Sequence, residues 1–175
     1  MGMPGRADVL SVLAQDHRAI QDIFARMTEA IGYDQLRSLT PVAIARLVRH
    51  EVAEELYLYP VTRKLVPGGD QIADRELAGH ADAERTMRTL EGTDVVDQRF
   101  VPLLRRLILD VQAHFRQQES VLFPLLIEYI DPGELRDLGH SVRRLHHQDP
   151  PPPPPKGTGL VDHIRRRTID NERAR

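Results

Sequence analysis

An internal repeat of histidines constrains the fold of this chain more than any other feature of its sequence. Both copies have a histidine, a polar side chain at +4, Glu at +5, an aromatic ring at +9 and Pro at +10. The copies start 64 residues apart and consist of His50, Glu54, Glu55, Tyr59, Pro60 and of His114, Gln118, Glu119, Phe123, Pro124. An upstream pair repeats after 63 residues, with His17 and Gln21 matched by His80 and Glu84. Each half of the chain is therefore predicted to be one helical hairpin, and two packed hairpins would bring four histidines together.

The spacing within each half suits metal binding. Successive residues of a helix turn by about 100°, so positions i and i+4 differ by about 40° and lie on one face. His50 can therefore reach the same ion as Glu54, and His80 the same ion as Glu84. Neutral imidazole and carboxylate are suitable ligands for iron, manganese or zinc.

The histidines also lie on the apolar faces of their helices. His17 shares its face with Leu13 and Ile20, and His114 shares its face with Val111. A buried imidazole needs a polar partner. One such histidine would be interpreted as a hydrogen-bonded core residue, whereas four of them with acidic side chains one turn away favour a metal site.

Apolar residues recur with helical spacing over four long segments and a shorter fifth one, which are residues 8–31, 40–66, 72–90, 97–130 and 134–147. The second segment is expected to begin at Thr40, a hydroxyl N-cap, with Pro41 at the first helical position. The connections between the segments are short. We therefore predict an all-α fold, an up-and-down four-helix bundle with a short fifth helix.

A run of six prolines begins at Pro150 and is expected to be an extended spacer, because proline lacks an amide donor. The segment 159–175 that follows is rich in charge, and we expect it to be solvated rather than folded. The predicted organisation is a helical metal-binding domain over residues 6–147 and a proline-rich C-terminal tail over residues 148–175.

Length and composition exclude several other classes of protein. At 175 residues the chain suits one domain with a sizeable core. It has no cysteine, which excludes disulfides, thiolate-bound iron–sulfur clusters and cysteine nucleophiles. Its net charge is −2 and 5% of its residues are aromatic, so nucleic acid is not an expected partner. No run of about 18 apolar residues and no secretory signal is visible, so we expect no membrane partner and a cytoplasmic location. The sequence carries no indication of the oligomeric state.

The chain resembles the hemerythrin-like (HHE cation-binding) domains over roughly residues 8–130, through His17, His50-x-x-x-Glu54, His80, His114, Glu119 and Phe123-Pro124. Its proline-rich tail is similar to the tails of stand-alone bacterial members. The resemblance implies a four-helix bundle around two iron ions joined by an oxo or hydroxo bridge, with manganese or zinc less favoured. It also implies a small-molecule partner, O2, peroxide (H2O2) or nitric oxide (NO), and a role in oxidative or nitrosative stress or in iron handling. The ligand set that it implies is His17, His50, Glu54, His80, Glu84, His114 and Glu119.

Two positions depart from the family pattern. Gln118 replaces the glutamate that many members have four residues after the last histidine, and an amide is a much poorer ligand. Oxygen-carrying members have a bridging carboxylate at position +5, so the resemblance implies that Glu119 bridges the metals instead. A regular helix points that position about 140° away from the histidine, so we expect a local distortion of the helix. Glu84 stands where oxygen carriers have a fifth histidine, and its negative charge should favour the ferric state. We therefore expect reaction with peroxide or NO rather than reversible oxygen carriage.

Other polar residues are assigned lesser roles. Gln118, Gln21 and Tyr57 are candidates for contacts with the ligands, although packing at the edge of the bundle is the favoured interpretation of Tyr57. Glu51 and Glu55 are expected to be solvated. Four further histidines outside the repeat are expected on the surface, and they are His140, His146, His147 and His163.

Competing interpretations differ in the site that they require. A ferritin-like carboxylate bundle would carry Glu-x-x-His on two helices, and none of the four repeat histidines has Glu three residues before it. A zinc hydrolase would have three protein ligands and a base around one ion, whereas four symmetry-related histidines fit two ions better. Two alternatives stay open: a metal-free bundle whose histidines pair with carboxylates, and a sensing or storage module rather than an enzyme.

Overall fold

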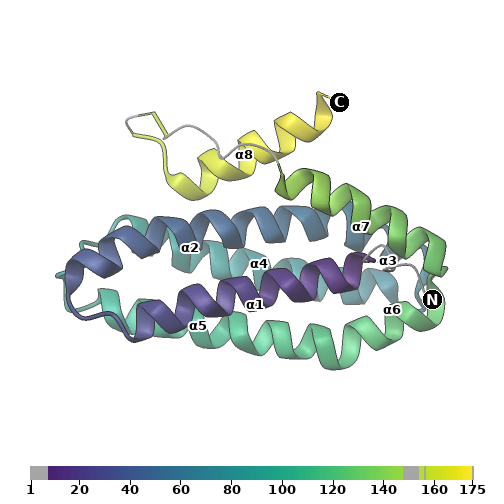
Figure 1. Cartoon of the computed structure of the whole chain (residues 1–175), viewed down its shortest axis with the longest axis horizontal. Coiled ribbons are helices and arrows are strands. Elements are labelled where there is room, and N and C mark those ends of the chain that lie inside the picture. The colour runs from purple at the N-terminus through teal and green to yellow at the C-terminus, as the bar shows by residue number, and fades with distance from the viewer. Residues whose placement is uncertain (1–7, 148–153, 156, 175) are drawn as a thin grey trace, which may run out of the picture.

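The computed structural model describes residues 8–147, 154–155 and 157–174, and helices joined by short connections make up nearly all of these residues (Figure 1). The α-helices are α1 Val9–Thr28, α2 Tyr33–Ala53, α3 Tyr59–Leu65, α4 Gly69–Glu91, α5 Phe100–Gln117, α6 Phe123–Tyr129, α7 Pro132–His146 and α8 Leu160–Arg173. Two π-helical segments, η1 Glu54–Leu58 and η2 Gln118–Leu122, join α2 to α3 and α5 to α6. The prediction of an all-α fold is confirmed.

Four long helical stretches lie side by side (Figure 1), and they are α1, α2–η1–α3, α4 and α5–η2–α6. Contacts join α1 to α2, α2 to α4, α4 to α5 and α5 to α1, so each long stretch touches two others. Their apolar faces form two clusters of buried side chains, one around Phe115 and one around Leu13. The ring of His17 stacks on Phe115 of the first cluster, at 3.9 Å, and faces Phe123 of the second, at 5.9 Å. His17 of the repeat therefore lies where the two clusters meet.

Local signals explain where several of these helices begin. The carboxylate of Asp8 accepts a hydrogen bond from the backbone amide of Ser11 at 2.8 Å and caps α1. Asp131 caps α7 in the same way, and Pro132 occupies its first turn. These caps fix where α1 and α7 begin, and both helices contribute side chains to the apolar cluster around Leu13.

The expected start of the second helix at Thr40 is wrong, because α2 begins at Tyr33 and carries Pro41 in its interior. The hydroxyl of Thr40 donates to the carbonyl of Leu36 at 2.7 Å within the helix instead of capping it. Leu36 and Leu39 are both buried. Their packing offsets the amide hydrogen bond that Pro41 cannot donate.

A close backbone approach fixes the junction between α3 and α4. A Cβ atom at Gly69 would lie 2.1 Å from the carbonyl oxygen of Thr62, so only glycine fits. The preceding Gly68 has a φ of +70°, which glycine adopts at low cost. The junction sets the register of the stretch that carries Glu54 against α4, which carries His80.

The C-terminal segment differs from expectation. Residues 160–173 form α8, which packs against α2 and α4 with Val161, Ile164 and Thr168 buried. The prediction of a solvated tail is wrong for these residues, because three side chains at helical spacing are enough to dock a helix on a neighbouring apolar surface. Residues 150–153 of the proline run lie outside the described residues, so the extended spacer stays a prediction.

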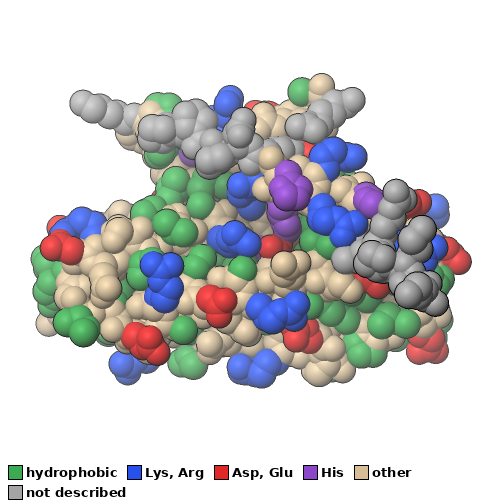
Figure 2. All heavy atoms as spheres, viewed as in Figure 1, with side chains coloured by type: hydrophobic (Ala, Val, Ile, Leu, Met, Phe, Trp, Pro, Cys, Tyr) green, Lys and Arg blue, Asp and Glu red, His purple; other side chains and the backbone are tan. Residues whose placement is uncertain are grey.

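The surface carries charges of both signs. Lys and Arg side chains are interspersed with Asp and Glu over the face shown in Figure 2, where the described residues form no extended patch of one sign. Among the described helices, none is long and apolar enough to cross a membrane.

Docking of α8 predicts a measurable contribution to stability. Ile164 is 1% exposed, so Ile164→Ala should lower the free energy of unfolding by about 2 kcal/mol or more, measured by urea denaturation. The matched control is Arg166→Ala at an exposed position of the same helix, expected to change stability by less than about 0.5 kcal/mol. Equal stability of the two variants would mean that α8 is undocked in solution.

Candidate metal centre

Histidines from four helices converge on one buried glutamate. The residues are His17 on α1, His50 on α2, Glu54 on η1, His80 on α4 and His114 on α5. His17, His50, Glu54 and His80 are buried, and the side chain of His114 is 21% exposed. Their ligand atoms form two groups, each within 4.8 Å, and the groups are His17, His50, Glu54 and Glu54, His80, His114. Glu54 belongs to both groups.

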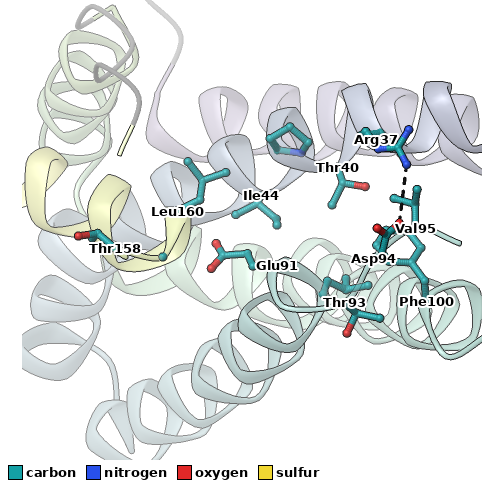
Figure 3. Close-up of a pocket in the computed structure, with 13 residues that line it drawn as sticks. Arg37, Thr40, Ile44, Glu91, Thr93, Asp94, Val95, Phe100, Thr158 and Leu160 are labelled. Atoms are coloured by element: carbon teal, nitrogen blue, oxygen red, sulfur yellow. Dashed lines mark ion pairs between the residues drawn. The ribbon is translucent and has the colours of Figure 1, made fainter. Parts of the chain in front are cut away.

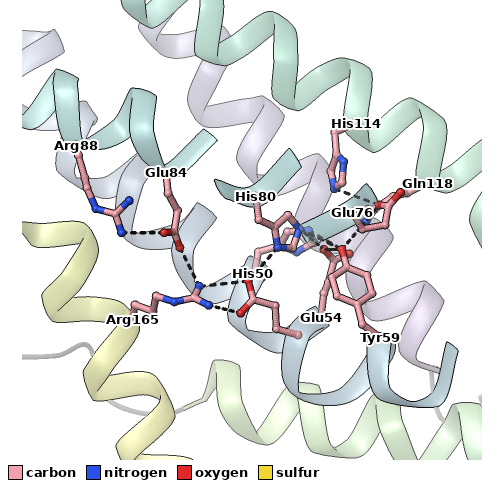
Figure 4. Close-up of polar contacts among 11 residues, drawn as sticks. His50, Glu54, Tyr59, Glu76, His80, Glu84, Arg88, His114, Gln118 and Arg165 are labelled. Carbon is pink, nitrogen blue, oxygen red and sulfur yellow. Dashed lines mark hydrogen bonds and ion pairs between the residues drawn. The ribbon is translucent and has the colours of Figure 1, made fainter. Parts of the chain in front are cut away.

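The two carboxylate oxygens of Glu54 point to different groups (Figure 4). Oε1 lies 3.7 Å from Nε2 of His50, and Oε2 lies 3.1 Å from Nε2 of His80. The hydroxyl of Tyr59 donates to Oε2 at 2.9 Å and lies 3.1 Å from Nε2 of His80. The carboxylate is therefore held between the two halves of the repeat.

The π-helical segments place the polar residues that follow the histidines. Each begins four residues after a histidine of the repeat, η1 at Glu54 and η2 at Gln118. Both close with a bond over five residues, from the amide of Tyr59 to the carbonyl of Glu54 and from the amide of Phe123 to that of Gln118. The distortion expected near Glu119 is present, and the first copy of the repeat has the same one. Single π-turns of this kind occur frequently at functional sites.

Three of the histidines have a carboxylate at their outer ring nitrogen, Nδ1. The pairs are His17 with Glu119 at 2.7 Å, His80 with Glu55 at 3.1 Å and His50 with Asp16 at 3.5 Å. Metal-binding histidines commonly donate their second ring N–H to such a partner, which orients the ring and raises its basicity. In His17 the hydrogen bond of Nδ1 with Glu119 leaves Nε2 as the unpartnered ring nitrogen, and Nε2 of His50 lies 3.7 Å from Oε1 of Glu54.

Unpartnered polar atoms test whether these residues fit a metal. Among the described residues, the buried atoms without a hydrogen-bond partner include four from the two ligand groups, namely Nε2 of His17, His50 and His114 and Oε1 of Glu54. Buried polar atoms are normally paired, so such a concentration needs an explanation. A cation would satisfy all four, and imidazole and carboxylate are donors that iron, manganese and zinc accept. The residues present therefore fit a metal.

The electrostatics of the centre follow from burial and from the close carboxylates. Burial alone would raise the pKa of Glu54, but His50 and His80 lower it, so the carboxylate is ionised. Burial alone would lower the pKa of His80, but its contacts with Glu54 and Glu55 raise it to about 10. Burial lowers the pKa of His114 to about 4. Without a metal, His80 therefore carries a proton and His114 does not.

Two of the expected ligands are not brought into these groups. Glu84 pairs with Arg165 of α8 at 2.8 Å and with Arg88 at 2.8 Å (Figure 4). The side chain of Glu119 is 45% exposed, and its contact is with the outer nitrogen of His17. The expectation that a terminal Glu84 tunes the redox preference of the centre therefore loses its geometric basis.

Of the residues that were expected to contact the ligands, one lies at the centre and the others do not. Gln118 is buried at the centre and its Nε2 lies 3.4 Å from the hydroxyl of Tyr59, whereas Gln21 is half-buried. The hydroxyl of Tyr57 donates to Glu172 of α8, so Tyr59 is the tyrosine that reaches the centre. The signal for Tyr59 was its place at +9 of the repeat, matched by the aromatic ring of Phe123.

Sequence reasoning missed several buried acidic residues. The expectation that Glu51 and Glu55 are solvated is wrong, since Glu51 is 4% exposed and the side chain of Glu55 is 16% exposed. Burial raises the pKa of Glu51 to about 8. Glu76 is 3% exposed, and its position four residues before His80 is the signal that could have revealed it. Asp16 is buried as well, next to His17 in sequence.

Three of the four histidines outside the repeat are only partly accessible, and they are His140, His146 and His163. Nε2 of His146 lies 3.1 Å from Oδ2 of Asp16, and the side chain is 21% exposed, so the expected surface position is wrong for this residue. His140 is half-buried and contacts Arg143 at 3.3 Å. His147 is exposed as expected.

A cavity of about 300 Å³ leads to the centre between α2, α4 and α5. Its polar lining includes His50, His80 and His114, with Glu51 beside them, and Val111 is part of its apolar wall. Three candidate ligands therefore lie at the wall of this cavity.

A second pocket, of about 460 Å³, lies elsewhere (Figure 3). It is formed where the start of α8 meets α2 and the connection between α4 and α5, with Ile44, Glu91 and Leu160 in its lining. No candidate metal ligand lines this pocket. It is therefore separate from the histidine centre.

The fold and the site define a helical protein that gathers histidines and a shared glutamate into a cation site. Residues 8–126 match the sequence model of the hemerythrin HHE cation binding domain, and the chain belongs to that family. An uncharacterized hemerythrin-like protein of Schizosaccharomyces pombe is 23% identical over 137 residues, which are 78% of this chain and 68% of the relative. No solved structure matches the chain.

Metal binding is predicted to release protons. With a pKa of about 10, His80 is protonated at pH 7.5 in the metal-free protein, and it must lose its proton to become a ligand. Anaerobic addition of Fe(II) should therefore release at least about one proton per chain, and the affinity should rise by about tenfold per pH unit between pH 7 and 9. Proton release is measured with an indicator dye, and protein already loaded with metal is the control. Binding without proton release would show that His80 is not a ligand.

Proposed function

We propose that this protein holds two iron ions in an up-and-down four-helix bundle and that the pair binds or reacts with O2, peroxide or NO. The observation that carries the proposal is the shared carboxylate of Glu54, which has one oxygen at each of two histidine groups. A single ion would not need two separate groups. Two ions joined by one carboxylate account for both.

Each proposed ion has three protein ligands. His17, His50 and Oε1 of Glu54 would hold the first, and His80, His114 and Oε2 of Glu54 would hold the second. Three protein ligands leave coordination positions open around a metal that prefers six ligands. A structural zinc site is closed by four protein ligands, so the open positions favour iron or manganese. Bound iron would supply redox chemistry towards O2, peroxide or NO.

The surrounding residues would control access and orientation. The cavity of about 300 Å³ admits a diatomic molecule or peroxide to His50, His80 and His114. The hydroxyl of Tyr59 would hold Oε2 of Glu54 in place through its hydrogen bond. These features support a role in oxidative or nitrosative stress or in iron handling.

A sensing role is a second candidate, favoured by the contact between α8 and the centre. Arg165 donates to Glu84 (Figure 4) and to Glu55, and Glu55 in turn contacts Nδ1 of His80. A change at His80 could therefore alter how α8 is held. In that case ligand binding, without turnover, would be the functional event.

Metal content of the purified protein tests the proposal. Protein from iron-supplied cells should contain about two irons per chain and show an optical spectrum that changes when peroxide or NO is added. Glu54→Gln should lose at least one iron, because the amide cannot bridge two ions as the carboxylate does. The matched control is Glu128→Gln at an exposed position of α6, which should retain both irons.

The outcomes separate the two roles. Sustained consumption of peroxide or NO would establish an enzyme, whereas a spectral change without turnover would favour sensing or storage. A protein that contains no iron and cannot be loaded with it would refute the proposal.

A further inference from the structure

The second half of the repeat lacks a carboxylate where the first half has its central one. Gln118 occupies the position that corresponds to Glu54, and both side chains are fully buried at the start of a π-helical segment. A neutral amide cannot balance the charge of a cation as a carboxylate does. By comparison with the first half of the repeat, the group of His80 and His114 therefore lacks one carboxylate ligand.

The structure places a different carboxylate beside this position (Figure 4). Glu76, on α4, is 3% exposed, and its Oε2 accepts a hydrogen bond from Nε2 of Gln118 at 3.0 Å. The same oxygen lies 3.6 Å from Nε2 of His114. Glu76 also precedes His80 by four residues, so the two side chains share one face of α4.

The polar partners of the buried Glu76, which are Gln118 and His114, are uncharged. Oε2 of Glu76 faces the neutral imidazole of His114, and among the described residues no Lys or Arg forms an ion pair with its carboxylate. A buried carboxylate without a counter-charge is costly. Nε2 of His114 and Oε1 of Gln118 also have no hydrogen-bond partner among the described residues. One cation at this place would satisfy the carboxylate and the imidazole together.

We propose that Glu76 is a metal ligand, which supplies to the ion held by His80 and His114 the carboxylate that Gln118 cannot provide. Gln118 is then a positioning residue, whose N–H group holds Oε2 of Glu76 towards the centre. The inference rests on the proposed two-iron function and specifies its second half. It also makes the two ions unequal, because the first has one carboxylate oxygen from Glu54 whereas the second has Glu54 and Glu76.

Exchanging the two side chains tests the proposal. Wild type, Glu76→Gln and the double variant Glu76→Gln/Gln118→Glu are titrated anaerobically with Fe(II), and stoichiometry and affinity are measured. Wild type should bind two ions, and Glu76→Gln should lose one or bind it at least about tenfold more weakly. The double variant returns a carboxylate to the repeat position and should recover the second ion. Asp74→Asn, at an exposed position of the same helix, is the control and should bind two.

The outcomes distinguish this inference from the proposed function. Two ions bound with unchanged affinity by Glu76→Gln would overturn the role of Glu76 and leave the two-iron function standing. Fewer than two ions in the wild type would overturn both. If Glu76→Gln does not fold, Glu76→Asp retains the charge on a side chain one methylene shorter, and weakening of one ion is expected. Unchanged binding of both ions by Glu76→Asp, together with no recovery in the double variant, would also overturn it.

Discussion

The buried negative charge of Glu54 is the interaction on which the rest of the centre depends. An ionised carboxylate inside a helical core is costly unless positive or hydrogen-bonding groups surround it. His50, His80 and the hydroxyl of Tyr59 meet that need, and each comes from a different turn or helix. These contacts join α2–η1–α3 to α4. Two further pairs add α1 and α5–η2, and they are His17–Glu119 and His114–Glu76. Polar contacts as well as two apolar clusters therefore join the four long stretches.

The π-helical segments explain how one glutamate can serve two groups of histidines. An extra residue in the turn rotates the positions that follow it, so that Tyr59 comes to lie over Glu54 although the two are five residues apart. The second copy has the same insertion but carries Gln118 and Phe123 at these positions. Equal backbones with different side chains therefore produce a centre whose two halves are chemically unequal.

The sequence predicts the helical class and the residues around Glu54, because helical spacing places His50 and Glu54 on one face and the repeat marks their counterparts. It does not predict the partner of Glu84, since Arg165 lies 81 residues away and reaches it through the docking of α8. Glu76 and Asp16 were missed because the repeat has no matching acidic residue. Contacts between distant helices decide the partner of Glu84 and the burial of Asp16, and local periodicity carries no information about them. The spacing of four residues between Glu76 and His80 was the one local signal that the repeat did not contain.

The contacts of α8 connect the centre to a segment outside residues 8–126, which define the family. Arg165 forms ion pairs with Glu55 and Glu84, and Glu55 lies 3.1 Å from Nδ1 of His80. A carboxylate that accepts a hydrogen bond from histidine raises the basicity of the ring, and an ion pair with arginine weakens this effect. The basicity of His80 therefore depends on the docking of α8, which carries Arg165. Val161 and Ile164 supply the docking through apolar burial. The contacts around His80 therefore depend in part on hydrophobic packing of a helix that lies outside the repeat.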